Sequence, residues 1–243
     1  MLAIFKKEIQ SFFTSPIGYL IIGLFLVLNG LFLWVFKGEF NIFDYGFADL
    51  SNFFLLAPWV FLFLIPAVSM KSFSEERKLG TLELLLIKPI SISKIVLGKF
   101  GGIFVLCLLA IIPSLVYVFA ISSLGIEEGN YDLGVVLGSY FGLLFLIGCY
   151  ASIGIFASSL TDNQIFAFVL AILLTFLIFY GIEALATLFS SGDIQELVKS
   201  IGAKRHFESI ARGVIATGDL VYFLSLTFFF LYLTTIRLKY LTK

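Results

Sequence analysis

The stretch Lys71-Ser-Phe-Ser-Glu-Glu-Arg-Lys-Leu-Gly-Thr-Leu-Glu-Leu-Leu-Leu-Ile-Lys-Pro-Ile90 is the main charged island in a very apolar chain. Two long hydrophobic runs precede it and four follow it. Lys and Arg residues close to membrane spans are retained on the cytoplasmic side, so this stretch is predicted to face the cytoplasm. Six of the sixteen basic residues lie in it or just after it: Lys71, Arg77, Lys78, Lys88, Lys94 and Lys99.

The charged island has the pattern of a short amphipathic helix. Ser72 and Glu75 have the spacing of a capping box, in which two side chains satisfy the free amides at a helix start. Pro89 cannot continue a helix. We therefore predict one helix over about 75–86 that is available to a soluble partner. Its apolar and polar faces are Leu79, Leu82 and Leu86 against Glu76, Gly80 and Glu83.

The composition indicates a single transmembrane domain over residues 1–243. Of these residues 60% are hydrophobic and only 13% are charged, whereas a soluble protein of this size needs a more polar surface. The formal net charge is zero, so no nucleic-acid partner is expected. Cys107 and Cys149 both lie inside apolar runs, where a small buried hydrophobe is a better interpretation than a disulfide.

The hydrophobic runs predict an all-α integral membrane protein with six transmembrane helices. Each run is long enough to cross about 30 Å of hydrocarbon. Asn29 is the strongly polar residue of the first run and is expected to face protein. Thr161-Asp162-Asn163 offers N-caps for the fifth. The spans are predicted at about 17–36, 53–70, 100–122, 133–160, 164–189 and 220–236.

Residues 1–15 and 190–218 are predicted to be helical without crossing the membrane. In residues 1–15 Phe5 and Ile9 recur at helical spacing opposite Lys6 and Lys7, which suits an interfacial helix. This segment is either a lipid-associated terminus or a helix that contacts a partner. Residues 190–218 hold two short amphipathic segments separated by Gly202, predicted to be re-entrant half-helices.

The distribution of basic residues places both termini and the loop 71–94 in the cytoplasm. With six spans, the cytoplasmic segments hold eleven basic residues: two near the N-terminus, six at the charged island and three at the C-terminus. The outer segments hold the other five, and this bias agrees with the positive-inside rule. The outer five are Lys37, Lys199, Lys204, Arg205 and Arg212.

Three residues near the predicted outer end of the fifth span are candidates for contact with a substrate. Glu183 either touches a substrate at the outer mouth or lies in the headgroup layer without a special role. His206 and Arg212 belong to the basic cluster 199–212. That cluster either binds anionic lipid or polymer, or pairs with the nearby acids Asp193, Glu196, Glu208 and Asp219.

A strip of glycines, Gly134, Gly138 and Gly142, lies along the fourth span. Small residues at this spacing let another helix approach closely. Packing within the chain is the favoured interpretation of the strip, and an interface between two subunits is the alternative.

The sequence lacks the residue sets of the common catalytic sites. Gly98-Lys99 has no upstream glycine of a phosphate-binding loop. A single His cannot build a His-rich metal site, and neither a metal centre nor a catalytic residue is predicted. The chain is therefore not expected to be an enzyme, and energy for any transport would come from another chain.

The charged island also carries a family resemblance. Glu75-Glu-Arg-Lys-Leu-Gly-Thr-Leu-Glu83, followed by Pro89-Ile-Ser91 and Gly98-Lys99, resembles the first cytoplasmic loop of ABC-2-type permeases. The N-terminal helix and the segment before the last span are similar to this family too, so the resemblance spans nearly the whole chain. Within the family it is closest to the gliding-motility permeases.

The resemblance implies a coupling helix that contacts a separate cytoplasmic ABC ATPase, with ATP and Mg bound on that partner and no cofactor on this chain. It also implies a second membrane subunit or a second copy of this chain, contact with membrane lipid, and a bacterial inner-membrane location. The implied ATPase-coupling residues are Glu75, Glu76, Arg77, Leu79, Gly80, Thr81, Leu82, Glu83 and Leu86.

Three functions fit these patterns. The first is the permease subunit of an ATP-driven exporter tied to gliding motility or cell-surface assembly. The second is an ABC-type complex that transmits force or regulates envelope machinery without moving a solute. The third is an ion-coupled carrier, against which the sequence shows no chain of acids and bases in the middle of the spans. The substrate and its direction of transport stay open.

Overall fold

The computed structural model describes residues 1–125, 131–213 and 216–241. All of the regular secondary structure in these residues is helical. Six runs of helix are long and apolar enough to cross a membrane, as the sequence predicts. The chain is thus an all-α, multi-pass membrane protein. The runs are Ile17–Val35, Ser51–Lys78, Ile92–Leu124, Leu133–Leu160, Gln164–Ala186 and Thr217–Leu241.

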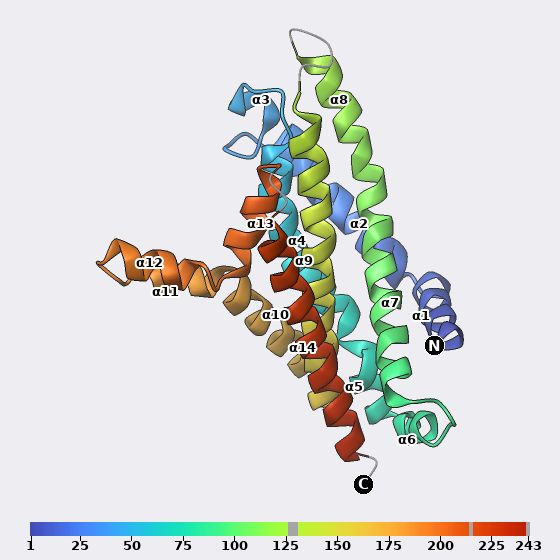
Figure 1. Ribbon diagram of the computed structural model, residues 1–243. Coiled ribbons are helices and arrows are strands. Elements are labelled where there is room, and N and C mark those ends of the chain that lie inside the picture. The colour runs from blue at the N-terminus through green and yellow to red at the C-terminus, as the bar shows by residue number, and fades with distance from the viewer. Residues whose placement is uncertain (126–130, 214–215, 242–243) are drawn as a thin grey trace.

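Most of these runs contain more than one helix (Figure 1). They comprise α2 (Ile17–Gly30) with π-helix η1 (Leu31–Val35); α4 (Ser51–Ser69) with α5 (Lys71–Lys78); α7 (Ile92–Ile111), 3₁₀-helix η2 (Ile112–Leu115) and α8 (Val116–Leu124); α9 (Leu133–Leu160); α10 (Gln164–Phe176), π-helix η3 (Leu177–Gly181) and α11 (Ile182–Ala186); and α14 (Thr217–Leu241). The remaining helices are α1 (Leu2–Thr14), α3 (Ile42–Tyr45), α6 (Thr81–Leu86), α12 (Gly192–Lys199) and α13 (Ala203–Ala211).

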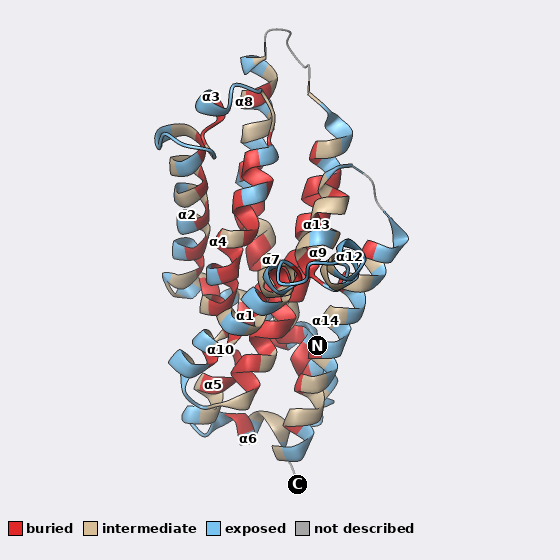
Figure 2. Ribbon diagram, turned by 90° about the vertical axis from the view of Figure 1, so that its left-hand side faces the viewer, coloured by how far each residue is buried: buried red, intermediate tan, exposed pale blue. Residues whose placement is uncertain are grey.

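The centre of the bundle is formed by α4 and α9. In the most apolar 18-residue stretch of the spans that contain them, 72% and 78% of the residues are buried. The corresponding share in the other four spans is 22–33%. Figure 2 shows the buried residues running along this pair. The outer spans therefore expose apolar side chains over much of their surface, which only lipid or another membrane protein can cover favourably.

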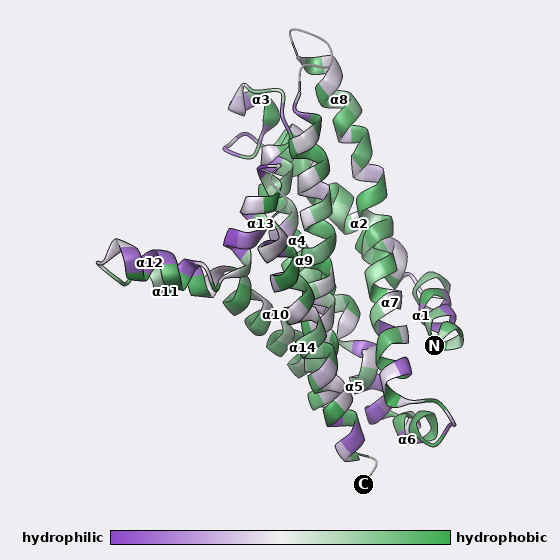
Figure 3. Ribbon diagram, in the orientation of Figure 1, coloured by the Kyte–Doolittle hydropathy of each residue, from purple (hydrophilic) through white to green (hydrophobic). Residues whose placement is uncertain are grey.

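The bundle has two distinct ends. Figure 1 shows α6 and the C-terminal end of α14 together at one end, called the α6 end below, and α3 and α8 at the other, the α3 end. Helix α1 lies across α7, and the α11–α12 pair projects sideways between the two ends. Figure 3 shows that hydrophilic residues gather at α12, α13 and the α6 end, while the spans are mainly hydrophobic.

Two predicted local features are present, and a proline interrupts the third span. Asn163 caps α10, because its side-chain oxygen accepts hydrogen bonds from the amides of Ile165 and Phe166. Asn29 is fully buried, as expected of a polar residue that faces protein. Pro113 lies in the 3₁₀ turn that interrupts the third span, since proline cannot donate the hydrogen bond of a regular helix.

The segment before the last span forms two short helices, α12 and α13, as predicted, and Gly202 lies at the start of the second. Val214 and Ile215 of this segment lie outside the described residues, as do Glu127 and Glu128 of the loop before α9. Helix α13 packs closely on α9 at Gly138 and Gly142, which have no side chains to keep the two helices apart. A Cβ on Gly138 would lie 2.9 Å from the carbonyl oxygen of Ile210.

Candidate functional site

The charged island begins where the second span bends at Met70, between α4 and α5. The hydroxyl of Ser158 in α9 accepts hydrogen bonds from the amides of Phe73 and Ser74, at 2.9 and 3.1 Å. It also donates to the carbonyl of Met70, at 2.8 Å. Ser158 thus satisfies backbone groups at the bend and fastens the start of α5 to the central helix.

We expect Ser158→Ala to lower the stability of the protein by about 2 kcal/mol, since two buried amides would lose an acceptor. The matched control is Ser159→Ala, because Ser159 is equally buried but bonds only to a carbonyl of its own helix. Thermal unfolding can be followed with a thiol-reactive dye that reports exposure of Cys107 and Cys149, both fully buried in the fold. Equal melting temperatures for the two variants would contradict this role.

The prediction of one helix over 75–86 is wrong. Helix α5 continues the second span to Lys78, and a separate helix α6 begins at Thr81. Between them Gly80 has a φ of +68°, a left-handed conformation that favours glycine and ends α5. Ser72 lies inside α5 and does not cap it, so the capping-box interpretation fails as well.

The break at Gly80 changes which leucines are available at the α6 end. Leu82 is buried and Leu86 is half-buried, whereas Leu79 is 68% exposed. The predicted apolar face of Leu79, Leu82 and Leu86 is therefore divided. Leu79, Leu84 and Ile87 instead form an exposed apolar set at this end, and Glu83 is exposed beside them.

A buried ion-pair cluster joins three separate parts of the chain. The side chain of Lys99 in α7 is only 2% exposed. Its ammonium lies 2.9 Å from the carboxylate of Glu8 in α1 and 3.0 Å from that of Glu76 in α5. The ammonium also lies 5.1 Å from the centre of the Phe73 ring. We call Lys7, Glu8, Glu76 and Lys99 the lysine node.

The lysine node is balanced in charge and extends to the surface. Lys7 in α1 forms a second ion pair with Glu76, at 3.1 Å. Burial by itself lowers the pKa of Lys7, but the hydrogen bond and charge of Glu76, with the charge of Glu8, outweigh it and raise that pKa. Two cations thus face two carboxylates, so each buried charge has an opposite neighbour.

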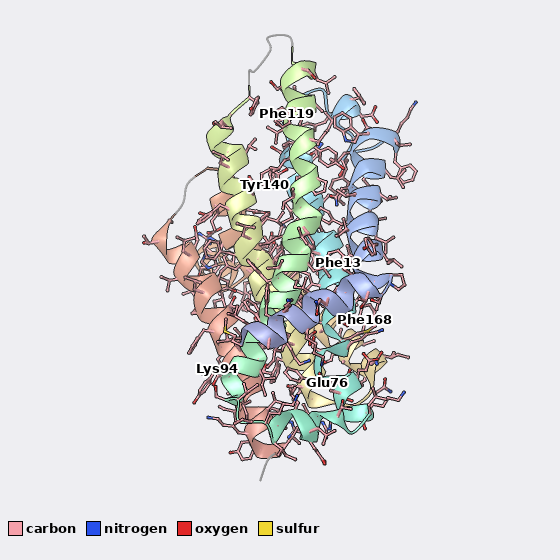
Figure 4. All side chains as sticks on the ribbon, turned by 90° about the vertical axis from the view of Figure 1, so that its right-hand side faces the viewer. Phe13, Glu76, Lys94, Phe119, Tyr140 and Phe168 are labelled. Atoms are coloured by element: carbon pink, nitrogen blue, oxygen red, sulfur yellow. The ribbon has the colours of Figure 1, made fainter. Side chains whose placement is uncertain are left out.

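Helix α1 reaches the lysine node because α7 presents glycines to it. A Cβ on Gly98 would lie 2.9 Å from Ile4, and one on Gly102 would lie 2.7 Å from Cβ of Glu8. Figure 4 shows α1 crossing α7, with Glu76 below the crossing. The side of α1 that packs inward is Ile4, Glu8 and Phe12, while Lys6 is exposed and Phe5 and Ile9 are half-buried.

Among the predicted coupling residues, Glu76 lies inside the protein. Its side chain is 15% exposed, and its second carboxylate oxygen is buried with no hydrogen-bond partner in the described part of the chain. Arg77 donates a hydrogen bond to the carbonyl of Leu160 at the end of α9, and Thr81 donates to the carbonyl of Glu76. These bonds hold α5 and the start of α6 to the bundle.

A cleft of about 580 Å³ separates α1 from α5 and α6. Its walls carry both charged and apolar side chains. Lys71, Glu75 and Lys88 line it, together with Leu79 and Leu84 from the exposed apolar set.

The three candidate substrate residues lie apart from the lysine node. Glu183 in α11 forms an ion pair with Lys204 in α13, at 2.8 Å. Nδ1 of His206 lies 2.6 Å from the Asp219 carboxylate, and Nε2 lies 2.8 Å from the Ser200 carbonyl, which can only accept. His206 therefore holds α13 to α14, whereas the side chain of Arg212 is exposed.

Sequence reasoning missed the residues that join the elements. Glu8, Lys99 and Ser158 were not predicted as partners. Lys99 lies between Gly98 and Gly102 at the start of the third span, and this pattern is a recognisable signal of a buried lysine beside a packed helix. In the part of the chain that the structure describes, no group of three or more His, Cys, Asp or Glu residues could hold a metal ion.

One comparison with known proteins finds a match that covers nearly the whole chain. The family model described as ABC-2 family transporter protein matches residues 2–238. No curated protein matches the chain. The matched range includes the lysine node, the charged island and the segment before the last span.

Proposed function

Because this chain belongs to the ABC-2 family of transporter proteins, we propose that it is the membrane-spanning permease subunit of an ATP-driven export complex. The family is a membrane component of ABC transporters, so ATP and Mg would be bound by a separate ATP-binding subunit. The α6 end, with α1 beside it, is the surface proposed to dock that subunit.

The lysine node is the observation that carries this proposal. It joins α1 and α5 to Lys99 near the start of the third span, so a force applied at either helix reaches that span. Ser158 and Arg77 join α5 to the central helix α9 in the same way. Closure of an ATPase against the α6 end would thus move the third span and the fourth span together.

The exposed apolar set is the proposed anchor for the ATPase. We expect Leu84→Asp with Ile87→Asp to abolish ATPase activity that co-purifies with the tagged chain from native membranes, because buried apolar anchors dominate such interfaces. The matched control is Phe43→Asp with Phe47→Asp, a pair exposed to a similar degree near the α3 end. Retained activity in the first pair with normal membrane insertion would contradict docking at this surface.

The acidic residues of this surface are tested separately. We expect Glu75→Lys with Glu83→Lys to weaken docking less than the apolar change, since single charges at an interface rim contribute little. Glu76 is unsuitable for such a test. A lysine there would add a third cation to the lysine node and disturb the fold itself.

The proposed orientation places both termini and the α6 end in the cytoplasm. Leu79→Cys and Phe43→Cys are suitable probes, because both positions are more than half exposed and they lie on opposite sides of the second span. In intact cells with Cys107 and Cys149 replaced, an impermeant thiol reagent is expected to label the cysteine at 43 and to reach that at 79 only after lysis. The reverse pattern would overturn the orientation.

The finer proposal is a role like that of the gliding-motility permease GldF in a bacterial inner membrane. A GldA-like ATPase and a GldG-like membrane subunit, or a second copy of this chain, would complete the complex. The support is the sequence resemblance of the charged island. Deletion of the gene in a gliding host is expected to stop surface movement while growth continues.

A further inference from the structure

Two neighbouring cavities share part of their walls on the side of the bundle where α13 packs. The first, of about 540 Å³, is lined almost entirely by charged residues of α11, α12 and α13. The second, of about 350 Å³, is lined mainly by apolar residues of α4, α9, η3 and α13. Lys204, Glu208 and Arg212 line both cavities, so a charged compartment continues into an apolar one.

The charged cavity has a surplus of positive charge. Its acids are already paired, because Glu183 and Glu208 contact Lys204 and Glu196 contacts Arg205. Lys199 and Arg212 also line this cavity, and neither has an ion pair among the described residues. Four basic and three acidic side chains line the cavity, so its wall has a net charge of +1, and Lys199 and Arg212 are the two cations that can contact an occupant.

The apolar cavity has an aromatic wall next to the basic rim. Trp59 and Phe179 line it, and their rings lie 5.8 Å apart. Trp59 also contacts the ring of Tyr180, over which the Lys204 ammonium lies at 5.5 Å. Leu55, which is 49% exposed, lines the same cavity from α4. An acyl chain fits such a wall, since it needs no hydrogen-bond partner there.

The surroundings of both cavities are apolar. Glu183 lies within the fifth span, and the walls of the apolar cavity come largely from the second, fourth and fifth spans. The α11–α12 pair that flanks the charged cavity exposes Leu185, Leu188 and Leu197. Figure 3 shows this hydrophilic patch beside hydrophobic helices. Unpaired cations so close to membrane spans favour an anionic partner from the membrane itself.

We infer that the paired cavities bind one anionic membrane phospholipid, with its phosphodiester headgroup at Lys199 and Arg212 and an acyl chain along Trp59 and Leu55. The site is complete within one chain, and the inference does not depend on whether the bound lipid is transported. Its failure would therefore leave the proposed function intact.

Trp59 provides a built-in probe for this lipid. In a Trp34→Phe background it is the remaining tryptophan, since the chain has two. The full chain is placed in phosphatidylcholine nanodiscs with a small fraction of acyl-brominated phosphatidylglycerol, or the same fraction of brominated phosphatidylcholine. Bromine quenches tryptophan fluorescence at short range. Stronger quenching by brominated phosphatidylglycerol than by brominated phosphatidylcholine therefore measures the enrichment of phosphatidylglycerol at Trp59.

We expect clear enrichment in this background and its loss by roughly thirtyfold in Lys199→Gln with Arg212→Gln, because each basic residue near anionic lipid contributes about a fivefold preference. The matched control, Lys37→Gln with Lys94→Gln, removes the same charge from exposed positions elsewhere and should keep the enrichment. Equal quenching by brominated phosphatidylcholine in all variants verifies that Trp59 still contacts the bilayer.

The acyl part of the site is tested by Leu55→Trp in a chain that keeps Trp59. Because the second ring complicates quenching, retention of phosphatidylglycerol is measured by native mass spectrometry. We expect fewer bound lipids when the apolar cavity is filled. Soluble glycerol phosphate should not displace the lipid, since it lacks the acyl chain. Displacement by glycerol phosphate, or equal enrichment of both brominated lipids before mutation, would overturn the inference.

Discussion

Lys99→Met is expected to destabilise the protein by about 3–5 kcal/mol, the usual effect of removing one partner from a buried ion pair. Lys99 is buried and faces two carboxylates, one from α1 and one from α5. Methionine has a similar length but no charge, so Glu8 and Glu76 would be left facing each other with Lys7 as their remaining cation. The melting temperature, followed by dye labelling of Cys107 and Cys149, is expected to fall sharply.

The informative control neutralises the whole cluster. The triple variant Glu8→Gln, Glu76→Gln, Lys99→Met should be more stable than Lys99→Met alone, because removing both members of a buried pair avoids an uncompensated charge. The same variant should support less ATP-dependent activity than the native chain, since α1 and α5 would no longer be held to α7 by charge. A triple variant no more stable than the single one would show that the cluster does not act as an ion-pair network.

Gly154→Ala is expected to have the second largest effect, about 3 kcal/mol, at the upper end of the usual cost of overpacking a core. A methyl group at this position of α9 would overlap Oγ of Ser69 in α4 and lie 2.8 Å from its Cβ. Both positions are fully buried, so the two central helices would have to separate at the point where the second span turns into α5.

Ser69→Gly should partly rescue Gly154→Ala, because it removes both of the atoms that the new methyl group meets. Alone, Ser69→Gly is expected to cost about 1 kcal/mol through the lower helix propensity of glycine. A double-mutant cycle on the melting temperature measures the coupling between the two positions. Strict additivity of the two changes would mean that α4 and α9 do not pack as closely as the distances indicate.

The spans could be predicted from the sequence because their signal is strong and local. Twenty or so apolar residues between charged loops define each of them, and the fourth span has the predicted bounds of Leu133 and Leu160. The two short helices before the last span were also predictable, since each has its own amphipathic period and Gly202 separates them.

The charged island was predicted less well because its structure depends on distant residues. The pattern from 75 to 86 is that of one helix, but the left-handed Gly80 and the contacts of α5 with α9 divide it. Ser158 lies more than eighty residues away in sequence from the amides that it binds. Glu8 was assigned to neither face of the first helix, whereas its ion pair with Lys99, far away in the sequence, places it inside the protein.

Helix α9 has the properties of a lever between the two proposed sites. It is 28 residues long, about 42 Å at 1.5 Å per residue, with no proline and no change of helix type. Its Ser158 holds the start of α5 near one end, and α13 packs on its Gly138 and Gly142 towards the other. A straight helix that is held near both ends bends little when one end is tilted. A small rotation of α5 would therefore be delivered, with little loss, to the helix that carries Lys204 and flanks the lipid cavities.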